Sequence, residues 1–194
     1  ICEEACATAK QKGVTVSCDL NYRKKLWSRE KAGQVMSRLC KYVDVCIANE
    51  EDAKDVFGIE AEDSDITGGR LNFDGYKDVA KKLSDRFGFD KVAITLRTSI
   101  SASENNWMGL LYDGGSFYLS KEYNMKIVDR VGGGDSFGAG LIYGLLSGKS
   151  PQEALEFAVA ASCLKHSIEG DFNHVSVDEV ENLARGDASG RVQR

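Results

Sequence analysis

Helix-like and strand-like segments alternate in the first third of the chain, and this alternation most constrains the fold. Apolar runs at Val14–Cys18 and Val45–Ala48 have the length of short strands. The segment that extends to about Lys12 and the segment from Arg29 to Tyr42 have a helical pattern instead. Because strands that alternate with helices pair in parallel, the pattern predicts an α/β domain with a mostly parallel sheet.

The middle of the chain continues this pattern and then changes it. A polar stretch with two adjacent glycines, at Asp63–Asp74, is expected to be a surface loop. An amphipathic segment, Tyr76–Phe87, leads into an apolar strand, Val92–Leu96. Two short candidate strands, Met108–Tyr112 and Phe117–Leu119, flank Asp113-Gly114-Gly115, so a β-hairpin is expected here.

The chain from Asp135 onward is predicted to be mostly helical. Ser150-Pro151-Gln152-Glu153 combines an N-cap, a proline at the first helical position and a capping-box glutamate. A last helix is expected from Val177 to just before Gly186. We therefore expect one domain over residues 1–185 and a polar tail over 186–194.

Composition narrows the function classes. With 42% hydrophobic and 28% charged residues and no run long enough to span a bilayer, no membrane partner is expected. The net charge is −5 and the sequence has no stripe of basic residues, which argues against nucleic acid as a binding partner. The six cysteines have no paired spacing and suit reduced thiols in a cytoplasm. The opening residues resemble the middle of a helix, so a fragment of a longer protein is expected.

The glycine-rich segment Asp129–Gly140 carries the chemistry. Three glycines, Gly132 to Gly134, run into Asp135 and an apolar helix, so backbone N–H groups and the helix dipole can form an anion site suited to a phosphoryl group. The segment fits neither the Walker loop nor the dinucleotide fingerprint. Asp135 is a candidate general base for a substrate hydroxyl; the alternative is an acidic N-cap on a glycine-rich turn.

This segment resembles the second signature of the ribokinase-like (PfkB) carbohydrate kinases, Asp-Thr-x-Gly-Ala-Gly-Asp. The chain has Arg130 in place of the threonine and Gly133 in place of the alanine, and this form is similar to that of 2-keto-3-deoxygluconate kinases. The resemblance implies that Asp135 is the catalytic base, which also binds the substrate. It further implies that Gly132, Gly133 and Gly134 form the anion hole, with Gly132 and Gly134 contacting the nucleotide.

A second segment, Asp19-Leu20-Asn21-Tyr22-Arg23, follows a predicted strand, where ligands gather in open parallel sheets. It is similar to the family's Asp-x-Asn-x-Arg segment. The resemblance implies that Asn21 and Arg23 bind the substrate, and that Arg23 also contacts the nucleotide phosphates. An arginine fork suits a carboxylate or phosphate, although Arg23 is equally explained as a surface charge beside Lys24 and Lys25.

A third segment, Asn49-Glu50-Glu51-Asp52, again follows a predicted strand and resembles the family's Asn-x-x-Glu motif. The resemblance implies that Asn49, with Glu50 or Asp52, organises Mg²⁺ and phosphate, mainly through water. Asp52 is one methylene shorter than the family's glutamate, so which acid takes this role stays open. Asn49 as the N-cap of a helix is the alternative.

Two further segments carry weaker signals. By resemblance Leu96, Arg97, Thr98 and Ser99 form a loop that contacts the nucleotide, and Asp171 is a ligand of a substrate hydroxyl; Arg97 is otherwise a solvated loop residue. His166 and His174 lack metal-ligand spacing and are expected at helix ends or in loops. Trp27 and Trp107 are expected to pack in the core or at its edge.

Together the resemblance implies a three-layer α/β/α domain of the ribokinase-like fold that lacks the amino-terminal strands and the lid. It implies a kinase that uses ATP and Mg²⁺, with a role for K⁺ left open, to phosphorylate 2-keto-3-deoxygluconate. Without the missing part, the 194 residues alone are expected to be weakly active or inactive, and the full-length protein is expected to be a homo-oligomer. The alternatives are another ribokinase-like kinase, such as a fructokinase, and a noncatalytic nucleotide-binding module.

Overall fold

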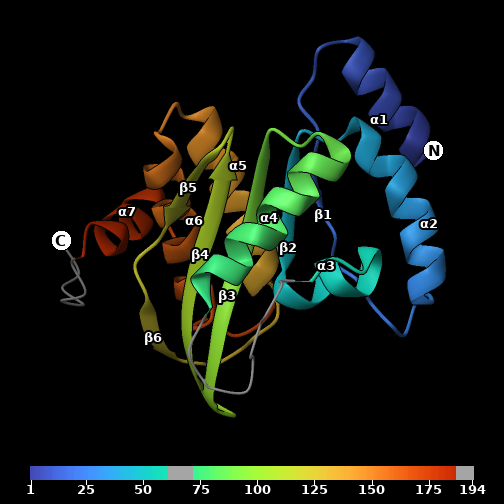
Figure 1. Cartoon of the computed structure of the whole chain (residues 1–194). Helices are drawn as coiled ribbons and strands as arrows, with labels where there is room; N and C mark the ends of the chain where they lie inside the picture. The colour runs from blue at the N-terminus through green and yellow to red at the C-terminus, as the bar shows by residue number, and fades with distance from the viewer. Residues whose placement is uncertain (61–71, 187–194) are drawn as a thin grey trace. The chain divides into compact units, whose positions relative to one another are not determined.

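The computed structural model describes residues 1–60 and 72–186, except for the side chain of Glu50. The chain divides into two compact units, whose helices and strands are labelled in Figure 1. The first comprises Ile1–Leu96 and Leu110–Phe117, and the second comprises Arg97–Gly109 and Tyr118–Arg194. Most of the expected loop at 63–74 and nearly all of the expected tail at 186–194 lie outside the described residues, and the single domain expected over 1–185 stays a prediction.

Three parallel-paired strands form the core of the first unit. They are β1 (Ser17–Asp19), β2 (Val45–Asn49) and the first part of β3 (Lys91–Ser101). β1 pairs parallel to β2, and β2 pairs parallel to β3, with Val45 opposite both Ser17 and Lys91. Because side chains on both faces of β2 are buried, its sequence has no polar alternation over Val45–Ala48, as is usual for a parallel strand.

The first strand begins later than the sequence predicts. Val14 is 54% exposed, and Val16 lies just before the ladder, where its carbonyl accepts hydrogen bonds from the N–H groups of Asp44 and Val45. The predicted strand Val14–Cys18 is therefore wrong at its start. An apolar run marks a strand, but only the register with β2 decides where pairing begins.

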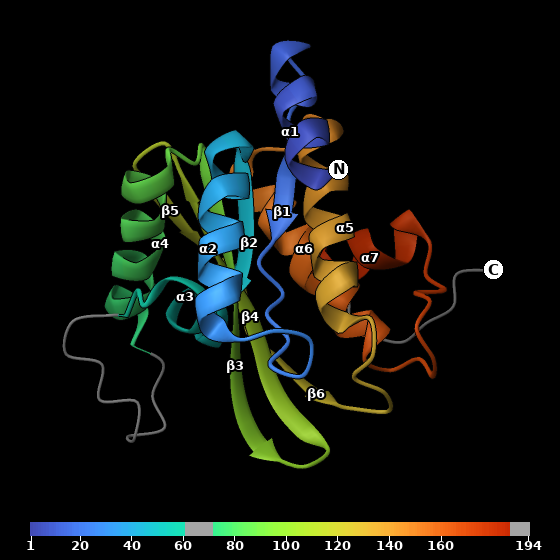
Figure 2. The ribbon, with the colours of Figure 1, turned by 90° about the vertical axis from the view of Figure 1, so that its right-hand side faces the viewer.

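Helices of the first unit are drawn in blue to green in Figure 2, and some of them begin at a polar side chain that caps the helix. They are α1 (Cys2–Gln11), α2 (Arg29–Leu39), the short 3₁₀ helix η1 (Cys40–Tyr42), α3 (Glu50–Phe57) and α4 (Phe73–Phe87). The side-chain oxygens that accept first-turn N–H bonds of α2, α3 and α4 belong to Ser28, Asn49 and Asn72. The helix expected from Tyr76 begins three residues earlier, because Asn72 caps it through the N–H of Gly75.

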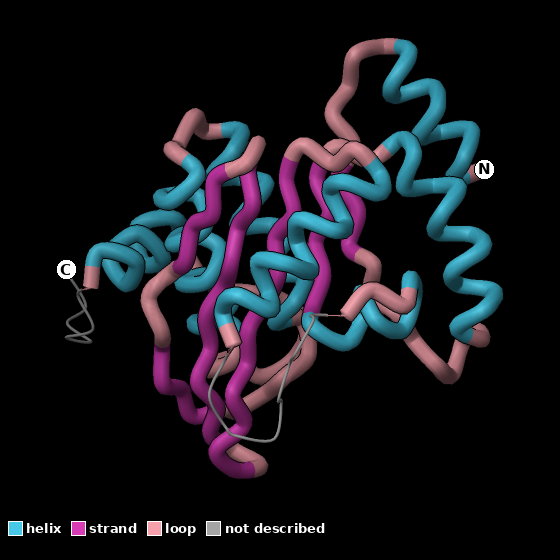
Figure 3. The backbone as a smooth tube through the Cα atoms, in the orientation of Figure 1, coloured by secondary structure: helices cyan, strands magenta, loops and turns pink. Residues whose placement is uncertain are grey.

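A long β-hairpin passes through both units. β3 continues to Ser101 and is followed, after a two-residue turn, by β4 (Glu104–Asp113) and then by β5 (Ser116–Leu119), drawn in magenta in Figure 3. β4 pairs with β5, and the turn at Gly114-Gly115 has positive φ at both glycines, so the predicted β-hairpin is confirmed. The loop expected at Leu96–Ser99 is wrong: these residues are in β3, because pairing with β4 extends the strand beyond its apolar part.

The second unit is mainly helical. It contains α5 (Gly133–Leu146), α6 (Pro151–Lys165) and α7 (Val177–Arg185), together with β6 (Tyr123–Lys126), which pairs antiparallel to β4. The predicted capping box at Ser150 and Glu153 is confirmed, and α7 ends at Gly186 as expected. The sequence does not indicate β6, because its four residues bury only Met125 and have no periodic pattern.

Small residues bring α5 and α6 into close contact. A Cβ on Gly140 would lie 2.9 Å from the Cα of Ala158, and one on Gly144 would lie 2.8 Å from the Cα of Ala154. Because nothing larger than glycine fits at these two positions, α6 holds α5 close along its length. This packing fixes the helix whose first residues form the glycine segment.

The strands follow the order β1-β2-β3-β4-β5, with β6 paired to β4, so the predicted α/β class is confirmed and the sheet is mixed. Among the described residues, none of the helices is both long and apolar enough to span a bilayer. All six cysteines are free thiols.

Candidate active site

The first turn of α5 presents free backbone donors beside a carboxylate. Gly132 is its N-cap residue, with φ of 78°, and no side chain caps the helix. The N–H of Ser136 is the one that bonds back to the Gly132 carbonyl, at 2.8 Å, so the N–H groups of Gly134 and Asp135 precede the helical ladder. Gly134 and Asp135 are both exposed. The segment can therefore hold an anion next to a solvent-accessible carboxylate.

Two of the three glycines are required by close packing, and the third is not. A Cβ on Gly132 would lie 2.4 Å from the carbonyl oxygen of Asp171, and one on Gly133 would lie 2.5 Å from Cε1 of His166. A Cβ on Gly134 would meet no atom within 4 Å. Other residues thus pack against the backbone at Gly132 and Gly133, whereas, among the described residues, no atom occupies the space beside Gly134.

Hydrogen bonds hold the residues just before the first turn of α5 in place. The two carboxylate oxygens of Asp129 accept from the N–H groups of Val131, at 3.0 Å, and Gly170, at 2.9 Å. These two bonds hold the pKa of the Asp129 carboxyl below its usual value. The hydroxyl of Ser162 donates to the Gly133 carbonyl at 2.8 Å. The first aspartate of the glycine segment is therefore a structural residue.

Asp171 lies beside the glycine segment. Its Oδ1 is 3.2 Å from the position of a Cβ on Gly132, and its side chain is exposed. The structure thus brings Asp171 together with Gly132, 39 residues earlier in the chain. An exposed carboxylate at this place is able to accept a hydrogen bond from a hydroxyl group.

The residues expected to contact a nucleotide along β3 differ in exposure. Leu96 is fully buried in the first unit, so its side chain is a core residue. Arg97 and Ser99 are exposed and Thr98 is half-buried, all three in the second unit. Burial lowers the pKa of His166, and the charge of Arg97 adds to this effect.

In the first unit, the chain after β1 makes a strained turn that carries Asn21 and Arg23. Asn21 has φ of 42°, in the left-handed region, and its N–H donates to Asp19 Oδ1 at 3.0 Å. Arg23 is exposed, and its Nη1 donates to the carbonyl of Tyr22 at 3.1 Å. The guanidinium therefore has further donors available for an anion.

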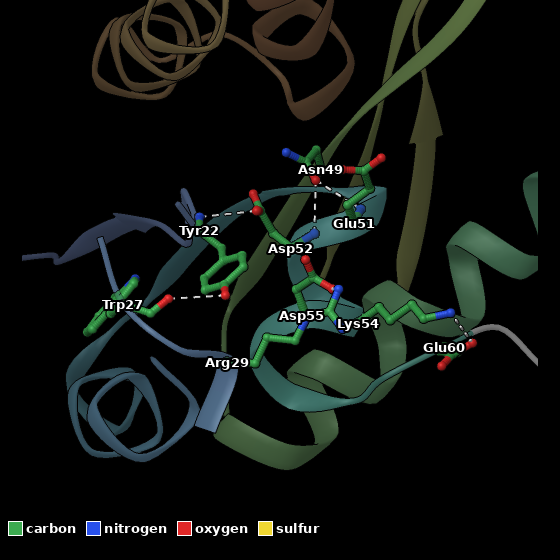
Figure 4. A network of polar contacts seen from close by, with 9 residues as sticks. All are labelled: Tyr22, Trp27, Arg29, Asn49, Glu51, Asp52, Lys54, Asp55 and Glu60. Atoms are coloured by element: carbon green, nitrogen blue, oxygen red, sulfur yellow. Dashed lines mark hydrogen bonds and ion pairs between the residues drawn. The ribbon is translucent and has the colours of Figure 1, made fainter. Parts of the chain in front are cut away.

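The turn after β1 is tied to the start of α3, as Figure 4 shows. The N–H of Tyr22 donates to Asp52 Oδ1 at 3.1 Å, and the Tyr22 hydroxyl donates to the Trp27 carbonyl at 3.2 Å. Asp52 is 4% exposed, and burial raises the pKa of its carboxyl despite the bond from Tyr22. The bond from Tyr22 thus ties the turn that carries Asn21 to Asp52, 30 positions after Tyr22 in the sequence.

Asn49 is the N-cap of α3. Its Oδ1 accepts from the N–H groups of Glu51 and Asp52, both at 2.9 Å, so the alternative that it caps a helix is confirmed. Within the described residues, no three His, Cys, Asp or Glu side chains are grouped to hold a metal ion. Asn49 and Asp52 carry amide and carboxylate oxygens, the type of donor that Mg²⁺ binds directly or through its water.

Two buried residues pack against the glycine segment, and the sequence-based predictions did not give them this role. His166 was expected at a helix end, and it is the C-cap of α6, but it is buried against Gly133. Lys165 is fully buried beside Gly132. Its spacing after Ala158, Ala161 and Ser162 gives the signal, since residues three, four and seven positions apart share one helix face.

The chain is similar to a family model and to several known proteins. The family model described as pfkB family carbohydrate kinase matches residues 1–173. A 2-dehydro-3-deoxygluconokinase from Thermotoga maritima, of known structure, is 49% identical with a TM-score of 0.88, over 95% of this chain and 54% of that chain. A PfkB family carbohydrate kinase from Listeria grayi is 36% identical with a TM-score of 0.81, over 94% and 54%.

A curated relative from Haloferax volcanii, named 2-dehydro-3-deoxygalactonokinase, is 30% identical over 96% of this chain and 52% of its own length. The chain thus spans about half the length of the relatives that it matches. Since the family model covers most of the chain, including the glycine segment and both segments of the first unit, the chain belongs to the pfkB family of carbohydrate kinases.

Proposed function

We propose that the whole protein phosphorylates 2-keto-3-deoxygluconate at its terminal hydroxyl with ATP. The observation that carries the proposal is the first turn of α5, where the exposed Asp135 follows the free N–H of Gly134. The 49% identity to a kinase named for this substrate supports the choice of sugar acid.

Asp135 acts as the general base in this proposal. Its carboxylate accepts the proton of the terminal hydroxyl, and the hydroxyl oxygen forms a bond to the γ-phosphorus of ATP. The bond between that phosphorus and the oxygen bridging to the β-phosphate breaks, and ADP leaves with the electron pair. The N–H groups of Gly134 and Asp135 donate to the phosphoryl oxygens and stabilise their charge in the transition state.

Arg23 recognises the acid group of the sugar in this proposal. Its guanidinium is exposed after β1 and has donors beyond the one that bonds to Tyr22. A planar guanidinium binds a carboxylate with two parallel hydrogen bonds, which a neutral sugar cannot accept in the same way. Asn21 and Asp171 bind hydroxyl groups, and Arg97 and Ser99 contact the nucleotide. Mg²⁺ bound to the nucleotide would supply further charge neutralisation, with Asn49 and Asp52 contacting its water shell.

The test is ATP-dependent phosphorylation by the whole protein, with 2-keto-3-deoxygluconate, its galactonate epimer, fructose and ribose as separate substrates. We expect selective turnover of a keto-deoxy sugar acid. We also expect Asp135→Asn to lower kcat by about 100-fold or more, the scale of general-base catalysis. Turnover of fructose or ribose alone would overturn the substrate, and no turnover with any of them would favour a nucleotide-binding module.

A variant at Arg23 tests the recognition of the acid separately. Arg23→Met should raise KM for the sugar acid while its KM for a neutral sugar stays unchanged. Lys24→Met, an exposed neighbour, is the matched control and should leave both constants unchanged. Equal effects of Arg23→Met on both kinds of sugar would contradict the assignment.

A further inference from the structure

A lysine is completely buried at the end of α6. Lys165 has 0% exposure, whereas the rest of the buried face of this helix consists of apolar or small side chains: Ala154, Leu155, Phe157, Ala158, Val159, Ala160, Ala161 and Ser162. Lysine is almost never fully buried unless it is paired, because its charge must leave water. Methionine or leucine would fill the same space without the cost of burying a charge, so packing does not explain why a lysine is at this position.

The ammonium group of Lys165 lies next to the glycine segment. Its Nζ donates to the carbonyl of Ile168 at 3.0 Å, and its Cε is 3.2 Å from the position of a Cβ on Gly132. Ile168 begins the turn that leads to Gly170 and Asp171, both of which contact the same segment. One buried side chain thus contacts both the turn after α6 and the loop before α5.

The charge of Lys165 acts on the groups around this loop. The hydrogen bonds from the N–H groups of Val131 and Gly170 are the main cause of the low pKa of Asp129, and the charge of Lys165 adds to their effect. Burial is the main cause of the low pKa of His166, and the same charge contributes there as well. Inside a protein such a charge is weakly screened and acts over a longer distance than on the surface.

We propose that Lys165 is a positioning residue of the phosphoryl-transfer site. Its buried ammonium group holds the Ile168–Asp171 turn against Gly132, and it adds a fixed positive charge next to the loop that binds the transferring phosphoryl group. This inference rests on the proposed kinase function. It predicts that removal of the charge weakens the binding of phosphate groups more than it weakens the fold.

The first test compares two lysine-to-methionine changes in the whole protein. Lys165→Met removes the charge at similar volume. It should raise the Kd of ADP and lower kcat/KM for ATP by about tenfold, while the affinity for adenosine is unchanged. Lys149→Met is the matched control: Lys149 is half-buried in the same unit, pairs with Glu181 at 2.8 Å, and should change stability but not ADP affinity. Unchanged ADP affinity and unchanged turnover of Lys165→Met would overturn the proposal.

The second test separates charge from shape. Lys165→Ala leaves a cavity, and n-propylammonium should restore turnover and ADP affinity severalfold, whereas 1-propanol, of similar size, should not. Equal restoration by both molecules would show that filling the cavity is sufficient and would overturn the role of the charge. If Lys165→Met fails to fold, Lys165→Gln, which keeps a donor, takes its place with the same expected loss of ADP affinity. If the unaltered protein binds ADP but phosphorylates none of the sugars, the proposed function fails and ADP affinity alone decides the role of Lys165.

Discussion

The imidazole ring of His166 occupies the space that a side chain on Gly133 would need. Its Cε1 lies 2.5 Å and its Nε2 lies 2.8 Å from the position of that Cβ. The ring cannot move aside easily, because its Nδ1 is 2.7 Å from the carbonyl of Ser162 and it contacts the ring of Trp107, with centroids 5.1 Å apart and the planes tilted by 54°. This contact explains why the chain has glycine where the family signature has alanine.

Gly133→Ala is therefore expected to destabilise the protein by about 1–3 kcal/mol, the usual cost of an extra methyl group in a packed site. In Gly133→Ala/His166→Ala the clash is absent, so the two changes together should cost less than the sum of the single changes, by about 1 kcal/mol or more. Urea unfolding of the four proteins measures this coupling. Additive free energies of unfolding would show that the ring and the glycine do not compete for space.

Gly134→Ala, in contrast to Gly133→Ala, should keep the stability of the protein but lower its turnover. Its Cβ would meet no atom within 4 Å, and its φ is not positive, so the free energy of unfolding should stay the same or increase by up to about 1 kcal/mol through helix propensity. The methyl group would nevertheless enter the exposed space in which the phosphoryl group is proposed to bind, so kcat should fall. A variant with wild-type turnover would argue against an anion hole at this turn.

Asp52→Asn is expected to stabilise the protein at neutral pH. Burial raises the pKa of this carboxyl in the folded state, so its contribution to stability is favourable at low pH and is lost as the pH rises through the folded pKa. The amide of the variant still accepts from the N–H of Tyr22, as Asp52 does now. Thermal unfolding should show a higher Tm for the variant at pH 7.5 and a smaller difference near pH 4.

Asp55→Asn, in the same helix, is the control for this change. Asp55 pairs with Arg29 at 2.7 Å, so its removal should lower the Tm slightly at pH 7.5, as expected for an ion pair at the surface with a half-buried carboxylate. If both variants lower the Tm equally, burial of the Asp52 carboxylate does not destabilise the protein.

The protein is expected to lose stability in mild acid because of the buried His166. Burial lowers the pKa of its imidazole below the usual 6.5, so the folded state binds this proton less readily than the unfolded state. Its stabilising contribution is complete above the unfolded pKa and is lost as the pH falls through 6.5 toward the folded value. Unfolding free energies between pH 8 and pH 5 should fall less steeply for His166→Gln than for the unaltered protein. His174→Gln, at an exposed position, should follow the unaltered protein.

The sequence by itself determined the features that depend on neighbouring residues. The capping box at Ser150 and Glu153, the turn at Gly114-Gly115 and the α5 helix after the glycines all form within a few residues, so their signals are local. The alternation of helices and strands also fixed the α/β class. The glycine segment and its resemblance to a family signature located the candidate base.

Tertiary structure alone decided the features that depend on partners distant in the chain. The start of β1 depends on its register with β2, and the length of β3 depends on β4, so neither could be read from an apolar run. Likewise the burial of Lys165 and His166 depends on the glycine segment that packs against them about 30 residues earlier in the chain. The sequence shows which side chains a helix face carries, but only the packing of that face decides what it supports.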